Sequence, residues 1–329
     1  MEDRSVHVRH SYAKLNLALA VSPPLPAGDR AGWHEITSWF VPVSLHDTLT
    51  VTRLEDDRLS RYAILWAEDA ARTSPIDWSI TKDLAVRAHR ALEAHAGRTL
   101  PVQMKLEKRI PVGGGLGGGS SNAGAMLLAT RTLFARETET ADLPSIGGSL
   151  GSDVPYFVGG QEESGGETRA PGAALVEGFG DRLERTPPVH AASGEPVWAT
   201  LIFPSIGCPT PGVYRAFDAI APEVLASQSG VAGEYEARAE RVRALARGGV
   251  VDPDALFNDL APAAQTVAPA IAELRAMLSG LTGLHTHITG SGSTLFQIAE
   301  DEEHALRVAR DIGDAVPKED GVAAPARLL

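Results

Sequence analysis

The sequence has little sulfur, an excess of acids over bases and no long apolar run, and each of these features excludes a class of protein. Cys208 is the one cysteine among 329 residues, so no intramolecular disulfide and no cysteine-based metal site can form. The net charge of -12 argues against nucleic acid as the main partner, because phosphate backbones call for a basic surface. No apolar stretch approaches the length of a membrane span.

The first ten residues, MEDRSVHVRH, have neither the apolar core of a signal peptide nor the acid-poor character of a transit peptide. We therefore expect a cytoplasmic protein that binds no nucleic acid and no membrane. The length of the chain favours two domains. The strand and helix pattern restarts after TPPVHAASGEP, which predicts an N-terminal domain over residues 1–187 and a C-terminal domain over residues 188–329.

Periodicity predicts a mixed α+β fold. Apolar Val102, Met104 and Leu106 alternate with polar residues, which is typical of a half-buried strand. The polar, glycine-rich segment 161–172 is expected to be a surface insertion. The predicted strands are 6–20, 36–45, 47–53, 101–110, the stretch VWATLIF and a strand-loop-strand in HTHITGSGSTLFQI, and the predicted helices are 82–96, 120–136, 212–219, 233–246 and 264–280.

A glycine cluster, PVGGGLGGGSSN at residues 111–122, is the most informative stretch of the sequence. Glycine loses the most conformational freedom on folding, so this cluster requires a compensating contact. A predicted strand precedes the cluster, and a helical pattern without acidic residues in its first turn follows it. Backbone N–H groups and the positive end of the helix dipole would therefore face the loop, which suits a phosphate. We predict that a phosphate is what comes close to these glycines.

Three other interpretations of the glycine cluster are less consistent with its context. A flexible linker would have Ser, Pro and charge on both sides. A Walker loop needs a lysine, whereas Gly119 is followed by Ser120. The dinucleotide pattern GxGxxG is formally present, but the acidic residue at the expected distance, Glu137, lies in a polar run and not at the end of a hydrophobic strand.

Three further stretches carry polar residues in unusual settings. Lys14 and Asn16 are two apart on a predicted strand and so share a face, which we expect to point away from the main core. Asp153 lies in LGSDVPYFVGG, where a helix cap or turn is the ordinary role of an aspartate. The glycine-serine loop in ITGSGSTLF is by itself consistent with a plain hairpin turn.

Together these stretches resemble the GHMP kinase superfamily, the ATP-dependent small-molecule kinases that include galactokinase, homoserine kinase and mevalonate kinase. Within it, the chain is most similar to the kinases that act on a cytidine diphosphate-linked alcohol in isoprenoid precursor biosynthesis. The resemblance extends over nearly the whole chain. It rests on AK-x-NL at 13–17, GWHE at 32–35, GGGLGGGSSNA at 113–123, LGSDVP at 150–155, ALVEG at 174–178, FNDL at 257–260 and GSGST at 290–294.

The resemblance implies a two-domain GHMP kinase fold, with an N-terminal domain like domain 2 of ribosomal protein S5 and an α+β C-terminal domain. It implies that Asp153 accepts the proton of the substrate hydroxyl with Lys14 beside it, and that Asn16 orients the substrate. The residues it implies for ATP binding are Pro111, Gly113, Gly114, Gly115, Leu116, Gly117, Gly118, Gly119, Ser120 and Ser121.

The resemblance also implies partners and a substrate subsite. Trp33 and Tyr214 would stack on the two faces of the cytosine, and His34 would hydrogen-bond its edge, although Trp33 is also consistent with a core tryptophan. ATP and Mg²⁺ are expected, but the sequence offers no carboxylate cluster as a protein ligand for the metal. A monomer or a weak homodimer is expected.

The sequence departs from the family pattern at three positions. Trp33 stands where Tyr is usual, Ser152 where Ala is usual, and Asp83 where Asn commonly lies near the adenine. Three other functions therefore stay open at this point. They are a GHMP kinase for another sugar or amino-acid alcohol, a non-catalytic relative that binds ATP and a metabolite, and a dinucleotide oxidoreductase.

Overall fold

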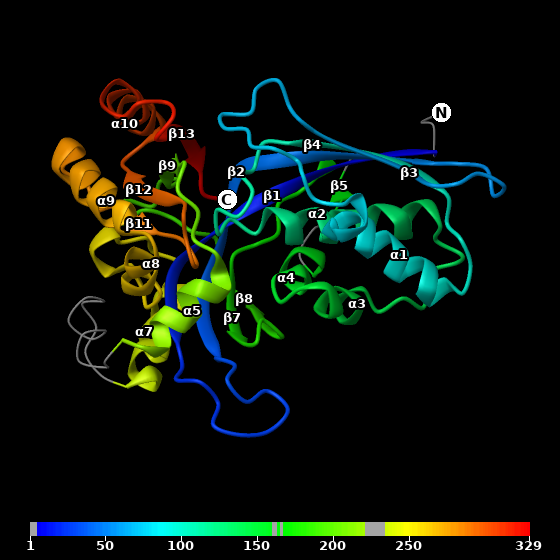
Figure 1. Cartoon of the computed structure of the whole chain (residues 1–329), viewed down its shortest axis with the longest axis horizontal. Helices are drawn as coiled ribbons and strands as arrows, with labels where there is room; N and C mark the ends of the chain where they lie inside the picture. Colours follow the sequence, from blue (N-terminus) through cyan, green and yellow to red (C-terminus); the bar gives the residue numbers. More distant parts are fainter. Residues whose placement is uncertain (1–4, 160–162, 165–166, 221–233) are drawn as a thin grey trace. The chain divides into compact units, whose positions relative to one another are not determined.

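A computed structural model describes residues 5–159, 163–164, 167–220 and 234–329 of the chain (Figure 1). The chain forms two units. Unit 1 contains Met1–Ala13, Leu45–Val112 and Gly117–Pro171, and unit 2 contains Lys14–Ser44, Gly113–Leu116 and Gly172–Leu329. Two long strands, β1 (Val6–Val21) and β2 (Ile36–Arg53), contribute residues to both units. No helix in the described ranges is long and apolar enough to cross a membrane.

Unit 1 packs helices on a short sheet. The end of β2 pairs antiparallel with β4, and β3 pairs parallel with β4. In β4 the residues Val102, Met104 and Leu106 are buried while Gln103 and Lys105 are exposed, which confirms the predicted alternation. The elements are β3 (Arg61–Trp66), η1 (Ile80–Lys82), α1 (Leu84–Ala96), β4 (Val102–Lys108), α2 (Gly118–Leu133), α3 (Leu143–Leu150), α4 (Val154–Val158), β5 (Glu163–Ser164) and β6 (Glu167–Thr168).

The core of unit 1 lies between this sheet and its helices. Leu92 of α1 and Met126 and Leu127 of α2 are buried in one cluster with Leu49 and Leu106 of the sheet. The buried residues of α1 follow the helical period, whereas α2 is buried on all sides over residues 121–127, so α2 is the inner helix of this layer. This packing holds the first turn of α2 against the sheet, where the glycine cluster ends.

Unit 2 contains a four-stranded antiparallel sheet in the order β11, β12, β9, β13. Within the same unit, β10 pairs parallel with β1, and β7 pairs antiparallel with both β2 and β8. The elements are β7 (Ala174–Gly178), β8 (Arg182–Arg185), β9 (Trp198–Pro204), α5 (Thr210–Asp218), α7 (Tyr235–Gly248), η2 (Pro253–Ala255), β10 (Phe257–Asn258), α8 (Ala261–Val267), α9 (Pro269–Thr282), β11 (His287–Ile288), β12 (Leu295–Ala299), α10 (Glu302–Ala315) and β13 (Gly321–Arg327).

The α+β class is confirmed, and the boundaries differ clearly from the predictions in two places. The segments predicted as strands 36–45 and 47–53 form one strand, β2. The predicted helix 264–280 is two helices, because Pro269 lacks an N–H and starts α9 after α8 has ended at Val267. The sequence patterns also missed β3, α3, α10 and β13. Within the predicted insertion 161–172, β5 and β6 form a short antiparallel pair, and residues 161–162 and 165–166 lie outside the described ranges.

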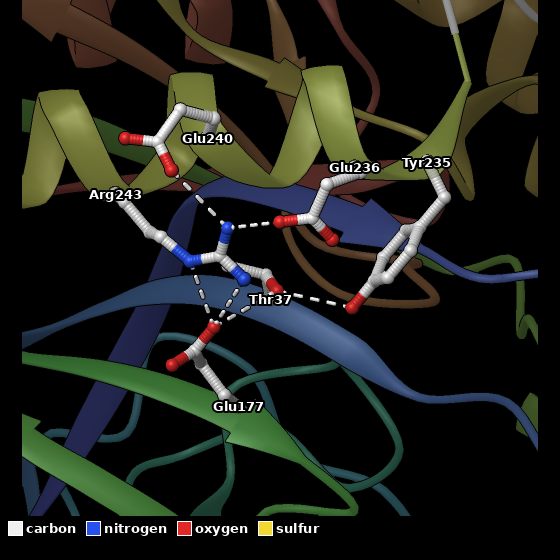
Figure 2. Close-up of polar contacts among 6 residues, drawn as sticks. All are labelled: Thr37, Glu177, Tyr235, Glu236, Glu240 and Arg243. Atoms are coloured by element: carbon white, nitrogen blue, oxygen red, sulfur yellow. Dashed lines mark hydrogen bonds and ion pairs between the residues drawn. The ribbon is translucent and has the colours of Figure 1, made fainter.

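Arg243 of α7 ties this helix to β7 inside unit 2. Its Nε and one terminal nitrogen donate to Glu177 Oε1 at 3.0 and 2.8 Å, and the other nitrogen donates to Glu236 and Glu240. Figure 2 shows the guanidinium between the three carboxylates, with Thr37 and Tyr235 beside it. The hydrogen bond to Glu236, followed by those to Glu177 and Glu240, raises the pKa of Arg243.

We predict that Arg243→Met lowers the free energy of unfolding by about 1–3 kcal/mol, because it leaves the largely buried Glu177 carboxylate without its charged donor. Arg307→Met is the matched control, since Arg307 makes one exposed pair with Glu303 on α10 and should change stability by about 0.5 kcal/mol at most. Urea unfolding of both variants measures the difference. Equal effects would show that the Arg243 cluster contributes no more than a surface ion pair.

Candidate active site

The glycine cluster forms a loop between β4 and α2, and Pro111 at its start is half-buried. Gly113, Gly115 and Gly117 have φ values of 75°, 76° and 71°. These values lie in the left-handed region, which side chains with a Cβ rarely adopt. Glycine is therefore required at these three positions by backbone conformation alone.

The neighbours of the glycines differ from the expectation that a phosphate excludes the side chains. A Cβ on Gly115 would lie 2.5 Å from the carbonyl oxygen of Thr289 and 3.0 Å from that of Gly292. A Cβ on Gly118 would lie 2.8 Å from Ile110 Cγ2. The protein itself therefore occupies the space next to these two glycines. A Cβ on Gly113, by contrast, would have nothing within 4 Å, so open space lies at this end of the loop.

The first turn of α2 is suited to an anion. Gly117 precedes the helix, no side chain caps it, and no acidic residue lies in its first turn. The first N–H groups of a helix have no partner within it and carry the positive end of its dipole. Ser120 in this turn is half-buried, whereas Ser121 is wholly buried, and its Oγ has no hydrogen-bond partner among the described residues. Gly119 is exposed, and Leu116 before the helix is buried.

Asp153 lies beside this turn of α2 in unit 1. A Cβ on Gly151, two residues before Asp153, would be 3.8 Å from Ser120 Oγ. Asp153 directly precedes α4, yet its side chain makes no capping hydrogen bond, and Ser152 Oγ lies 3.4 Å from its Oδ1. The ordinary role of a helix-capping aspartate therefore does not explain this residue. Asp153 is half-buried, and the chain two residues before it lies against Ser120 in the first turn of α2.

Lys14 and Asn16 are both 4% exposed in unit 2, so the strand face that they share is buried within the protein and is not open to solvent. Lys14 Nζ donates to Asn16 Oδ1 at 2.6 Å and to the carbonyl oxygen of Gly115 at 3.0 Å. Asn16 Nδ2 in turn donates to Ser38 Oγ at 2.9 Å. Lys14 Nζ also lies 4.6 Å from the centre of the Phe40 ring. The ammonium is thus held in place by Asn16 and by the glycine loop.

The GSGST loop is a hairpin between β11 and β12, as one interpretation predicted, and it also supports the glycine loop. Thr294 N donates to the carbonyl oxygen of Gly114 at 3.2 Å. The backbone N–H of Asn16 donates to Thr289 Oγ1 at 2.9 Å. A Cβ on Gly290 would be 3.2 Å from Asn16 Oδ1. Thr289 is a residue of this region that the sequence did not reveal. The glycines next to it were the one signal in the sequence that this loop comes close to another part of the chain.

Asp47 is a second residue that the sequence did not reveal. It is fully buried in unit 1 and accepts hydrogen bonds from Lys108 Nζ at 2.7 Å and Asn122 Nδ2 at 2.9 Å. It also accepts from the backbone N–H groups of Arg109 and Ile110 at 2.6 and 2.8 Å. One carboxylate therefore fixes the end of β4 and the first turns of α2, on the two sides of the glycine loop.

The predicted aromatic residues divide into two pairs in unit 2. Trp33 is 59% exposed, and its ring centre is 6.1 Å from that of Phe179. His34 and the half-buried Tyr214 have ring centres 5.1 Å apart. Trp33 is thus not a core tryptophan. Phe179, which the sequence patterns did not single out, also lies under the guanidinium of Arg30, with 4.1 Å from its ring centre to the guanidinium carbon.

Both ring nitrogens of His34 are engaged within the protein. Nδ1 lies 2.8 Å from the carbonyl oxygen of Ser22, which only accepts, so Nδ1 carries the proton. Nε2 lies 3.3 Å from Asp218 Oδ1, and the His34 side chain is 4% exposed. His34 therefore joins the start of the 22–34 segment to the end of α5. Its contacts place Tyr214, one turn before Asp218, next to this segment.

Two further sequence-level expectations concern the nucleotide and the metal. Asp83 caps α1 through hydrogen bonds from the N–H groups of Ala85 and Val86, and Trp78 Nε1 donates to its other oxygen. In the part of the chain that the structure describes, no three His, Cys, Asp or Glu side chains form a group able to hold a metal ion.

Comparisons with known proteins identify the family of this chain. The sequence matches the descriptions "GHMP kinases N terminal domain" over residues 83–161 and "GHMP kinases C terminal" over residues 237–318. The fold and the glycine loop thus define an ATP-dependent kinase of the GHMP class, which confirms the resemblance. More narrowly, the chain belongs to the family of 4-diphosphocytidyl-2-C-methyl-D-erythritol kinases, as its similarity to the relatives described next shows.

The relative from Desulfitobacterium hafniense, named 4-diphosphocytidyl-2-C-methyl-D-erythritol kinase, is 33% identical over 304 residues, which cover 91% of this chain and 89% of that protein. A crystal structure of 4-(cytidine 5'-diphospho)-2C-methyl-D-erythritol kinase is 31% identical, with a TM-score of 0.69 and 98% of each chain covered. Homoserine kinase from Cytophaga hutchinsonii has a TM-score of 0.62 at 14% identity, over 100% of this chain and 96% of that one, and shares the fold alone.

Proposed function

We propose that this enzyme transfers the γ-phosphoryl group of ATP to the 2-hydroxyl of 4-diphosphocytidyl-2-C-methyl-D-erythritol. The products are the 2-phosphate and ADP, in the methylerythritol phosphate route of isoprenoid precursor biosynthesis. The observation that carries the proposal is the identity of 33% over 91% of the chain to a kinase named for this substrate. The fixed glycine loop, the α2 end and the buried Lys14 supply the parts that phosphoryl transfer needs.

The proposed reaction is an in-line displacement. The 2-hydroxyl oxygen forms a bond to the γ-phosphorus, the bond from that phosphorus to the β,γ-bridging oxygen breaks, and the hydroxyl proton passes to the Asp153 carboxylate. Lys14, held by Asn16 and Gly115, stabilises negative charge at the reacting oxygen. We assign Asn16 the positioning of Lys14 as well as of the substrate, because its amide is bonded to both Lys14 and Ser38.

ATP would lie against the loop that begins at Pro111 and ends in the first turn of α2. The N–H groups from Gly117 to Ser120 and the open space at Gly113 suit phosphate oxygens. Mg²⁺ bound to those oxygens would neutralise charge on the triphosphate, and Ser120 is the hydroxyl placed to reach it. Ser121 would support this turn from its buried position.

Three wider assignments complete the proposal. We assign ATP binding and catalysis to a domain over residues 1–187 and the substrate side to a domain over residues 188–329. The enzyme acts as a monomer or a weak homodimer. It works in the cytoplasm, where its single cysteine, Cys208, stays reduced.

We propose that Trp33 and Tyr214 form the cytosine subsite together with His34, which follows Trp33 in the chain and contacts Tyr214. The exposed indole of Trp33 offers a free face for stacking. Because both nitrogens of His34 are engaged, its contact with the cytosine edge would require exchange of the Asp218 partner. The Phe179 ring makes an edge contact with the Trp33 ring, so we include Phe179 in this subsite.

We predict that Trp33→Ala weakens binding of the cytidine substrate by about 1–3 kcal/mol, since base stacking on an aromatic ring is lost. Stability should change by about 0.5 kcal/mol or less, because the side chain is mostly exposed. Calorimetric titration with the substrate and with ATP measures both affinities, and ATP binding is the internal control. Loss of ATP affinity to the same extent would place Trp33 outside a cytosine subsite.

The function is tested by coupled detection of ADP release with a panel of alcohols. The cytidylylated alcohol should be turned over in preference to galactose, homoserine, mevalonate and the bare methylerythritol phosphate. Preference for one of the first three alcohols would assign the enzyme to another GHMP activity. Binding of ATP without release of ADP from any alcohol would make it a non-catalytic relative.

A further inference from the structure

A cavity of about 480 Å³ lies inside unit 2, lined by residues of β10, β11, β12, α8 and α9. Its volume is in the range of small-molecule binding sites. Asn16 is the one residue of the proposed ATP and substrate sites that lines it. Neither the catalytic carboxylate nor any aromatic of the cytosine subsite belongs to its wall. The other residues of the cavity wall therefore have no assigned part in the proposed reaction, and their chemistry needs an explanation of its own.

The cavity wall has two charged side chains, Arg275 of α9 and Asp254, and the Asp254 carboxylate lies against His285 and not against Arg275. Arg275 Nε donates to the carbonyl oxygen of Thr286 at 2.6 Å, and within the described ranges no carboxylate pairs with the guanidinium. Burial lowers the pKa of Arg275, and no acidic neighbour opposes this shift. A partly desolvated guanidinium without a counter-ion is unfavourable, and a carboxylate or phosphate is its natural partner. This is unexpected in a chain with 42 acidic and 30 basic residues.

Two histidines, His285 and His287, also line the cavity and bring ring nitrogens to its wall. Burial, and then the charge of Arg275, lowers the pKa of His287 to about 3, so this ring is neutral. Its Nε2 is buried, and among the described residues it has no hydrogen-bond partner. His285 is exposed, and its Nε2 lies 3.1 Å from Asp254 Oδ1. Both histidines and Arg275 are cavity-lining residues, so three nitrogen-bearing side chains converge there.

The rest of the cavity wall is partly apolar. Phe257 and Phe296 line it, and the Phe296 ring is stacked on His287 with 5.2 Å between ring centres. A bare ion would leave much of this volume empty. We propose that the cavity binds a small organic oxyanion, in which a phosphate or carboxylate group meets Arg275 and an apolar body meets the two phenylalanine rings.

The cavity shares a wall with the supports of the active site. Asn16, which holds Lys14 Nζ, lines it. Asn258 also lines it, and its Nδ2 donates to the carbonyl oxygens of Ile288 and Gly290 at 2.8 Å each. Gly290 packs against Asn16 and Gly115. An occupant of the cavity therefore contacts residues that position Lys14 and the glycine loop.

The proposal is tested by calorimetric titration of the full chain with phenyl phosphate, benzoate and inorganic phosphate, in the presence of saturating ADP. Arg275→Met should weaken binding of the preferred aromatic anion about 10-fold or more, and Arg275→Lys should weaken it less. Arg310→Met, an exposed position of α10 outside the cavity, should leave binding unchanged. Thermal unfolding of each variant confirms that it is folded.

The three probes distinguish the sources of the oxyanion. Tighter binding of phenyl phosphate than of benzoate identifies a phosphate ligand, and the reverse identifies a carboxylate. Inorganic phosphate should bind more weakly than phenyl phosphate, since it leaves the apolar wall uncovered. The proposal is overturned if no probe binds the unmodified chain at millimolar concentration, or if Arg275→Met and Arg310→Met bind alike. Because no turnover is measured, this result is independent of the proposed kinase activity.

Discussion

Asp153→Asn is expected to lower kcat by roughly 10² to 10⁴-fold while the protein stays folded and keeps both ligand affinities. The amide is nearly isosteric with the carboxylate but is far too weakly basic to accept the alcohol proton. Asp153 makes no capping hydrogen bond that the substitution would remove. Because the transition state of phosphoryl transfer can be loose, proton removal can come late, which places the loss toward the lower end of this range.

A matched control for Asp153→Asn is Asp142→Asn in the same unit. Asp142 caps α3 by accepting a hydrogen bond from the N–H of Ser145 at 3.2 Å, so its substitution should lower stability slightly and leave kcat unchanged. Lys14→Met should slow the same step as Asp153→Asn. The double variant should lose less than the product of the two factors if the residues act as a unit. Turnover of Asp153→Asn within about twofold of the parent would exclude Asp153 as the base.

Gly115→Ala is expected to lower the free energy of unfolding by about 2–5 kcal/mol and to abolish ATP turnover. The new Cβ would lie 2.5 Å from the carbonyl oxygen of Thr289, on a backbone with φ of 76°. Backbone atoms of the 289–292 loop would have to move, and Lys14 Nζ is bonded to the carbonyl of Gly115 itself. The change therefore acts on stability and on the ammonium together.

Gly113→Ala separates the two causes of the Gly115 effect. Gly113 has φ of 75° but open space around a Cβ, so only the backbone strain of about 1–2 kcal/mol should appear. Urea unfolding and the ADP-release assay measure both variants. If Gly113→Ala and Gly115→Ala lose the same stability, the close approach of the Thr289 carbonyl does not constrain the loop.

Local patterns in the sequence were enough to predict the elements around the site. The alternation in β4, the glycine cluster and the missing acids at the start of α2 all act between near neighbours in the chain, where periodicity and capping are decisive. The order of the motifs then indicated the GHMP class. Both the α+β class and the family were confirmed.

The contacts that hold the site could not be predicted in this way. Asn16 and Thr289 are 273 positions apart, and Asp47 and Asn122 are 75 apart. Their pairing depends on how distant segments pack, on which a single sequence gives no periodic signal. The same limit explains why the burial of Lys14 and Asn16 was not predicted, and why we expected a phosphate to explain Gly115 and Gly118. The nearest groups are Thr289 and Ile110 of the chain itself.

The Asp47 carboxylate determines whether the glycine loop loses its conformational entropy on folding or on nucleotide binding. A free glycine-rich segment would lose about 1–2 kcal/mol per residue on becoming ordered around a triphosphate. Here the residues before and after the loop, Ile110 and Asn122, are both bonded to one buried side chain. The loop is therefore ordered when the chain folds, and that entropy belongs to folding and not to nucleotide binding. Under the proposed role of the loop, this core aspartate would raise the affinity for ATP through folding, by ordering both ends of the loop in advance.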